Sequence, residues 1–197
     1  MKKLIITISF LLSTAAHAGI FGSSFLVEPY VGYNTENTKL TDLSNNLIEI
    51  KTASPNLGLK LGFRSMMGID VNLFGELTQG KAQVTGLIDK NNFTKTASGV
   101  QLGVNSLGAV KMFLGATLSN DFKLAQSSLI NETTFSGPSY HVGLLIRTLS
   151  YLNIGLQYTL NQYNKVKGAN YTLGESTEKY YSKIDTQNYS IYLSSTF

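Results

Sequence analysis

Few residues of this chain have side chains suited to catalysis, and His141 is the only histidine beyond residue 18. Ser139 precedes it by two positions, so the two side chains would share one face of a strand. A serine beside a histidine and a carboxylate performs nucleophilic acyl transfer. The chain has no nucleophile elbow, phosphate-binding glycine loop or spaced set of metal ligands. We therefore expect His141 to be a structural hydrogen-bonding residue, and we predict no catalytic residue, metal or cofactor.

Charged residues are the second group of chemical interest. They recur on one parity of short segments whose other parity is almost purely apolar. Inside a closed barrel, charges on one face can pair with charges of opposite sign. Eight strands leave room for little beyond side chains, so we expect a plugged lumen and not a pore. The predicted lumen network consists of Glu28, Lys60, Arg64, Asp70, Glu76, Lys111, His141 and Arg147.

Eight segments of alternating polarity must position these residues. They lie at about 25–34, 53–64, 69–78, 97–105, 110–119, 138–147, 152–161 and 189–197. Short turns at about 65–68, 106–109 and 148–150 alternate with long polar stretches, predicted as loops, at about 36–51, 79–95, 120–135 and 162–183. Strands of ~9–11 residues with alternating short and long connections are typical of outer-membrane barrels. We predict an all-β fold, an eight-stranded antiparallel transmembrane up-and-down β-barrel whose first and last strands pair.

The orientation of the two strand faces needs further evidence, because a lipocalin-like soluble barrel places its apolar face inward. The charges share one parity, and an apolar face turned to water would form a very large apolar patch. Gly32, Gly58, Gly62, Gly99, Gly103, Gly115, Gly143 and Gly155 fall on the charged parity, as a narrow lumen requires. Aromatic residues on the apolar parity form two girdles: Tyr33, Tyr140, Tyr158 and Tyr189 towards the long connections, and Phe25, Phe63 and Phe197 towards the short turns. The apolar face is therefore predicted to meet lipid.

The N-terminus has the three parts of a secretory signal peptide: Met1-Lys-Lys, the apolar run 4–12, and Ala16-His-Ala18. We expect residues 1–18 to be the signal peptide and residues 19–197 to form the barrel domain. The chain has no cysteine, which excludes disulfides and thiolate metal sites. Its net charge of +4 includes Lys2 and Lys3, so the remaining charge is too small and too evenly spread to indicate binding to nucleic acid.

The last strand carries the most specific pattern, Tyr189-x-Ile191-x-Leu193-x-x-x-Phe197. Together with the opening strand 26–33 and the rhythm of turns and loops, it resembles the small eight-stranded OmpA/OmpX-type barrel superfamily. No peptidoglycan-binding segment follows Phe197 in this sequence, so OmpX-like members are the closer comparison. The resemblance implies that the barrel-assembly machinery reads Tyr189, Ile191, Leu193 and Phe197. Ser195 departs from the apolar residue usual at its position.

The same resemblance implies a place in the bacterial outer membrane, among its lipids and lipopolysaccharide. We expect a structural or adhesive protein that binds an extracellular ligand through its loops, of which 162–183 is the longest and bears several tyrosines. Two alternatives remain. One is a lipid-A-modifying enzyme, although Val142 and Gly143 follow His141, so the deacylase pattern His-x-Ser is absent. The other is a narrow channel for small solutes.

Overall fold

The computed structural model describes residues 24–86, 90–106, 109–126, 131–149, 151–168 and 171–197. The predicted signal peptide, residues 1–18, lies outside them. Among the described residues no helix is long and apolar enough to cross a membrane. The strands are β1 (Ser24–Asp42), β2 (Leu47–Arg64), β3 (Ile69–Val84), β4 (Asn91–Ser106), β5 (Val110–Leu124), β6 (Thr133–Ser136), β7 (Ser139–Arg147), β8 (Leu152–Asn161), β9 (Lys165–Gly168), β10 (Tyr171–Ser176) and β11 (Tyr181–Ser195), with one 3₁₀ turn, η1 (Thr177–Lys179).

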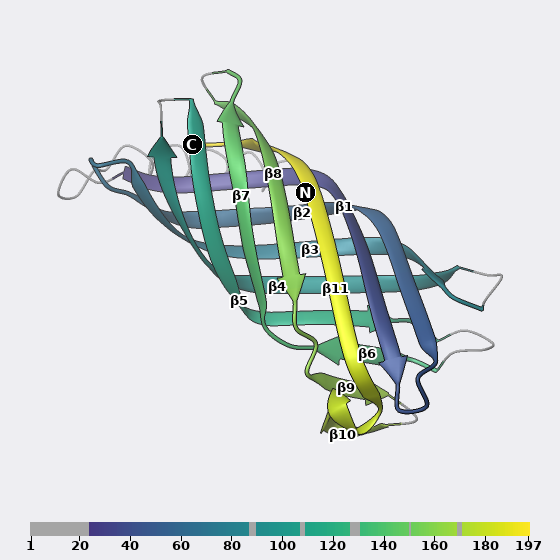
Figure 1. The fold of residues 1–197 in the computed structure, drawn as a ribbon. Helices are drawn as coiled ribbons and strands as arrows, with labels where there is room; N and C mark the ends of the chain where they lie inside the picture. The colour runs from purple at the N-terminus through teal and green to yellow at the C-terminus, as the bar shows by residue number, and fades with distance from the viewer. Residues whose placement is uncertain (1–23, 87–89, 107–108, 127–130, 150, 169–170) are drawn as a thin grey trace, which may run out of the picture.

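These strands form one antiparallel sheet that closes on itself, as Figure 1 shows. β7 pairs with β5 on one side and with β8 on the other, and β8 pairs with β11. β11 in turn pairs with β1, in a register that places Tyr33 opposite Ile191. Beyond this ladder, Val27 and Phe197 exchange two backbone hydrogen bonds of 3.0 and 3.1 Å. The predicted eight-stranded barrel and the predicted pairing of its first and last strands are confirmed.

The predicted long loops are wrong in extent, because most of their residues are strand. β1 continues to Asp42 and β2 begins at Leu47, so only a tight turn separates them. Likewise, β3 continues to Val84 and β4 begins at Asn91. We call the described residues within 36–52, 79–96, 120–136 and 162–188 the extension, and those within 24–35, 53–78, 97–119, 137–161 and 189–197 the membrane part. Buried and exposed residues also alternate in the extension, but there the exposed side chains are mostly polar. Strands of this kind have no strongly apolar outer face, so a sequence pattern based on such faces does not detect them.

Irregular backbone separates the two parts in several walls of the barrel. The wall that starts as β7 continues as β6 only after a break at Gly137 and Pro138, and the wall of β8 breaks before β9. The β4–β5 register shifts between Ser98 and Gly99, which leaves Leu118 of β5 as an extra residue. Such bulges bend strands and change their twist.

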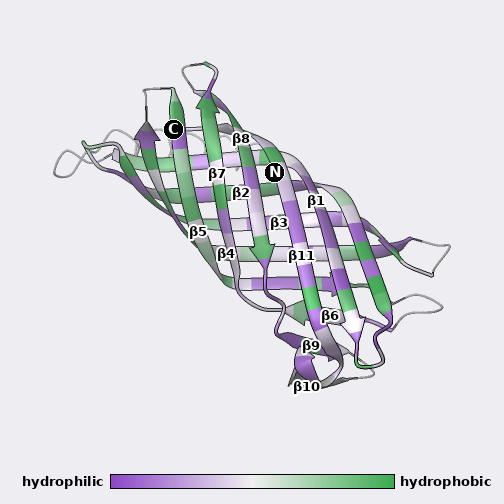
Figure 2. Cartoon of the chain, in the orientation of Figure 1, coloured by the Kyte–Doolittle hydropathy of each residue, from purple (hydrophilic) through white to green (hydrophobic). Residues whose placement is uncertain are grey.

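The outer face of the membrane part is apolar, as predicted. The alternation of hydrophobic and hydrophilic residues along the strands is visible in Figure 2. The exposed side chains include Val31, Leu57, Leu61, Val71, Leu73, Val100, Leu102, Leu114, Val142, Leu144, Leu156 and Leu193. A continuous band of this kind requires lipid and not water around it.

Candidate functional site

The lumen of the membrane part contains a chain of alternating charges. Arg64 binds Asp70 through two hydrogen bonds of 2.8 and 3.0 Å. Lys111 bridges Asp70 at 2.9 Å and Glu28 at 3.4 Å. Glu28 then pairs with Lys60 at 3.2 Å. Four of these side chains are buried and Arg64 is partly exposed. The three cations exceed the two anions by one charge, so the network needs further compensation.

Aromatic rings around Lys60 supply part of that compensation, and Glu76 supplies a third negative charge through Tyr30. The Nζ of Lys60 lies 5.2, 5.0 and 4.7 Å from the ring centroids of Tyr30, Phe113 and Tyr192. It also donates a hydrogen bond of 3.0 Å to the hydroxyl of Tyr192. Rings at this distance attract a cation through their negative faces. The hydroxyl of Tyr30 donates to Glu76 at 2.9 Å, which connects the predicted network member Glu76 to this cluster.

Glycine makes room for these rings. The ring of Tyr30 lies where the Cβ of any other residue at position 58 would be, and the ring of Tyr192 does the same at position 155. Both glycines belong to the inward set deduced from the sequence. Their role is steric, because each glycine is the paired residue on the neighbouring strand and leaves room for the ring to lie over that strand.

His141 is buried between Phe74 and Phe113, with ring centroids 5.0 and 6.1 Å away. Its Nε2 has no hydrogen-bond partner among the described residues, which differs from the hydrogen-bonding role expected from the sequence. Ser139 instead bonds to Thr117, through its amide at 2.7 Å and its hydroxyl at 3.1 Å. Ser139, His141 and Glu76 line a cavity of about 20 Å³, which is room for about one water molecule. Among the described residues no group of acidic, histidine or cysteine side chains could hold a metal.

Arg147 does not join the charge network. It is the last residue of β7, and its side chain is exposed at the mouth beside the short turns. No ion pair links it to another residue in the described part of the chain. Arg147 follows the inward-facing positions of β7, but it is the last residue of that strand. Its guanidinium therefore lies at the exposed end of the lumen and not inside it.

A second buried charge cluster lies in the extension and was missed by sequence reasoning. Glu36 accepts hydrogen bonds from Lys95 at 2.5 Å, Tyr163 at 2.9 Å and Asn188 at 3.1 Å. Burial, together with the neighbouring Glu36 carboxylate, raises the pKa of Tyr163 well above its usual value. All four residues come from different strands or connections, so only closure of the barrel brings them together.

Above this cluster the interior of the extension is apolar. Phe122 stacks on Phe93, with ring centroids 5.3 Å apart, and tilts against Tyr163 at 6.2 Å. Phe135 contacts Tyr163 and Tyr181, both at 6.1 Å. The buried residues of this core are Leu40, Ile50, Ala82, Val84, Phe93, Phe122, Leu124, Phe135, Tyr163, Val166 and Tyr181. The core makes the extension a packed structure in its own right.

The outer surface of the extension is polar and carries exposed lysines. Lys123 of β5 and Lys167 of β9 lie on either side of Thr134 in β6, and Lys165 lies opposite Ser136. We call Lys123, Lys165 and Lys167 the lysine face. Lys123 pairs with Glu132 at 2.9 Å, whereas Lys165 and Lys167 form no ion pair with another described residue.

On the opposite flank of the extension, lysines are balanced by an acid. Glu49 pairs with Lys51 at 2.9 Å and with Lys39 at 4.0 Å. The lysine bond and a second hydrogen bond from Asn37 hold the pKa of Glu49 below its usual value. Asp121 lies across Ser136 from Lys165, so the lysine face combines three lysines with two acids, and it differs from this flank in that Lys165 and Lys167 form no ion pair with another described residue.

The predicted girdle and terminal residues lie on the outer face. Tyr33, Tyr140, Tyr189, Phe63 and Phe197 are exposed. Phe25 and Tyr158 are half-buried, because Phe25 packs edge-on against Phe63 at 5.4 Å and Tyr158 packs against Tyr189 at 5.0 Å. Ile191 and Leu193 of β11 are also exposed. Ile191 lies between Tyr33 of β1 and Leu156 of β8, and Leu193 lies between Val31 of β1 and Ile154 of β8.

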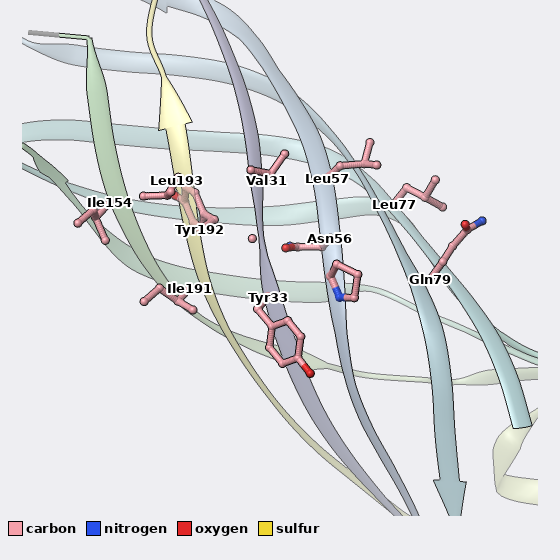
Figure 3. A pocket seen from close by; sticks show the side chains of 12 residues that line it. Val31, Tyr33, Asn56, Leu57, Leu77, Gln79, Ile154, Ile191, Tyr192 and Leu193 are labelled. Atoms are coloured by element: carbon pink, nitrogen blue, oxygen red, sulfur yellow. The ribbon is translucent and has the colours of Figure 1, made fainter. Parts of the chain in front are cut away.

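A shallow furrow of about 850 Å³, which Tyr33 helps to line, lies on the outer face. Figure 3 shows its walls, formed by Val31, Leu57 and Leu77 together with Ile154, Ile191 and Leu193. These side chains come from five strands and are apolar. The furrow is continuous with the lipid-facing band. Its walls are mostly apolar, and the described side chains do not form the cluster of converging polar groups that is typical of a catalytic site.

No protein-family model matches the chain, and no curated protein sequence matches it significantly. Solved structures do match it. Ail of Yersinia pestis has a TM-score of 0.56 at 13% identity, over 87% of this chain and 98% of that one. Neisserial surface protein A has a TM-score of 0.52 at 14% identity, over 89% and 99%. OprG of Pseudomonas aeruginosa has a TM-score of 0.50 at 12% identity, over 89% and 96%.

Identities this low establish the fold alone. The closed sheet, the apolar outer band and the filled polar lumen agree with that fold, since only a closed barrel lets strands satisfy their backbone in lipid. The chain is a small eight-stranded β-barrel with the fold of these bacterial outer-membrane barrels.

Proposed function

We propose that this barrel is a non-enzymatic surface protein that binds an extracellular ligand through the extension. The observation that supports this is the apolar core of the extension, which joins residues from Leu40 to Tyr181. A binding surface carried on packed strands is held more rigidly than one carried on loops, so less conformational entropy is lost on binding. The membrane part then serves as the anchor.

The ligand class that the surface favours is a sulfated glycan. On the lysine face, Lys123 and Lys167 lie two strands apart, with only the small Thr134 between them. The usual spacing of strands separates their backbones by ~10 Å. Ammonium groups at this spacing can contact successive sulfates of an extended chain. The structure of Ail, a barrel of the same fold, was determined in complex with the heparin analogue sucrose octasulfate.

Surface plasmon resonance on immobilised heparin tests the proposal, using the full barrel in detergent. The triple variant Lys123→Gln, Lys165→Gln, Lys167→Gln should bind at least about tenfold more weakly, and binding should fall with added salt. The charge-matched control, Lys39→Gln with Lys51→Gln and Lys183→Gln, also removes three positive charges and should bind nearly as the parent does. Equal loss in both variants would indicate general electrostatic attraction, and no binding by the parent would reject the glycan.

The two alternatives are less well supported. Ser139 and His141 face a cavity of about 20 Å³ that is far too small for an acyl chain. The charge network and the apolar core occupy the lumen in both parts. We expect mass spectrometry of lipid A to be the same with and without the gene, and planar bilayers to show no stepwise conductance. Altered acylation or a defined conductance would overturn the proposal.

A further inference from the structure

The short turns at the end of the barrel opposite the extension are unusually apolar. In the turn after β2, Met66 and Met67 are 84% and 87% exposed, the highest values among the exposed large hydrophobic residues. In the turn after β7, Leu149 and Tyr151 are 58% and 63% exposed. Neither turn contains a charged residue, and residues 106–109, between β4 and β5, contain none in the sequence.

The backbone fixes the shape of these turns. Gly68 has a φ of +76°, and its amide donates to the carbonyl of Ser65 at 3.0 Å. Thr148 and Leu149 both donate from their amides to the carbonyl of Leu152, at 3.0 and 3.2 Å. The apolar side chains are thus held outward by closed turns.

Exposed apolar residues of the lipid-facing band flank both turns, with Arg64 and Ser65 before the first turn and Arg147 and Thr148 before Leu149 as the polar residues between. Phe63 and Ile69, on either side of the first turn, are exposed apolar residues, and Ile146 precedes the second. A turn that stood in water would gain nothing from four exposed apolar side chains, whereas a turn at the depth of the lipid headgroups would bury them.

One cation accompanies this surface. Arg147, just before the second turn, is exposed at the mouth of the barrel and has no ion-pair partner among the described residues. Arg64, before the first turn, is already neutralised by Asp70. A guanidinium at this depth suits a lipid phosphate, which it can bind with two hydrogen bonds.

We infer that the turn end of the barrel is embedded in the inner leaflet, with Met66, Met67, Leu149 and Tyr151 at headgroup depth and Arg147 binding the phosphate of an anionic phospholipid. This surface is separate from the extension and independent of any ligand bound there.

The absence of tryptophan from the chain makes the inference directly testable. Met67→Trp and Leu149→Trp each introduce a sole tryptophan, and Leu43→Trp places a control at the exposed tip between β1 and β2. Each variant is folded into phosphatidylcholine vesicles containing lipid brominated near the headgroup, with iodide on both sides of the membrane. The heat-dependent shift in gel mobility verifies folding.

We expect the bromolipid to quench the fluorescence of the Met67→Trp and Leu149→Trp variants severalfold more than that of the Leu43→Trp control, and iodide to quench in the reverse order. Iodide quenching of all three variants to the same extent, without bromolipid quenching, would place the turns in water and overturn the inference.

The phosphate contact is tested on the Leu149→Trp background. Brominated phosphatidylglycerol diluted into unbrominated phosphatidylcholine should quench about twofold or more above brominated phosphatidylcholine at the same fraction. Arg147→Gln should abolish this preference and Arg147→Lys should keep most of it. A preference unchanged by Arg147→Gln would refute the role of Arg147.

Discussion

Below the tyrosine girdle the barrel is polar inside and apolar outside. Above it the outer face is polar, and beyond the buried Glu36 cluster the interior is apolar. β1 shows both states on one strand. Glu28 and Tyr30 point inward and Val31 outward in the membrane part, whereas Leu40 points inward and Lys39 outward in the extension. From Glu28 to Leu40 the inward parity of β1 does not change. The solvent around each part therefore decides which chemistry a face carries, while the backbone pairing stays the same.

The comparison predicts that a lost charge is most damaging in the membrane part. Glu28→Leu leaves Lys60 and Lys111 without their shared carboxylate, and breaking a buried pair in this way costs about 3–5 kcal/mol. Thermal unfolding in detergent, followed by gel mobility, should shift clearly downward. The partly exposed Glu49→Leu serves as the control and should change little. An unaltered unfolding temperature for Glu28→Leu would contradict the salt-bridged plug.

In the extension the largest loss should come from an apolar side chain. Phe122→Ala removes the stack on Phe93 and the contact with Tyr163, at a cost of about 3–5 kcal/mol. Because the defect lies outside the bilayer, limited proteolysis should cut the extension while the membrane part stays protected and heat-modifiable. Leu47→Ala, at an exposed position, should stay resistant. Loss of the folded gel form would show that the two parts unfold together.

A smaller effect should follow Tyr163→Phe, which deletes one hydrogen bond to Glu36. Hydrogen bonds to charged groups contribute about 1.5–3 kcal/mol. The variant should be more easily cleaved than the parent but less so than Phe122→Ala. If Phe122→Ala proved the milder of the two, the polar cluster and not the apolar core would hold the extension together.

The smallest effect concerns the tip between β1 and β2. The pKa of Asp42 is lowered, first by the side chain of Asn46 and then by the backbone amides of Asn46 and Ser44. A carboxylate whose pKa is lower in the folded state stabilises the turn above its unfolded pKa, and this contribution is lost as the pH falls through the folded pKa. NMR should show the amide shifts of Ser44 and Asn46 titrating with a midpoint below that of free aspartate. Asp42→Asn should remove this titration.

The sequence predicted the membrane part because its two faces differ completely in polarity. It predicted Glu28, Lys60, Asp70 and Lys111 in one network because their parity placed them in one lumen. It missed the extension because residues such as Leu40 and Ile50 alternate with threonine, lysine and glutamate, so neither face is strongly apolar. The partnership of Glu36 with Lys95 had no local signal, since the two residues meet only through barrel closure.

The seam between β1 and β11 has a kinetic consequence. The hydroxyl of Thr35 donates to the carbonyl of Tyr189, which lies 154 residues away in sequence. Closing a segment of this length carries an entropic penalty of about 4–5 kcal/mol, whereas the hairpins between successive strands close over short distances. The hairpins should therefore form early and the seam last. Until then β1 and β11 are open edges, able to pair with any strand that meets them.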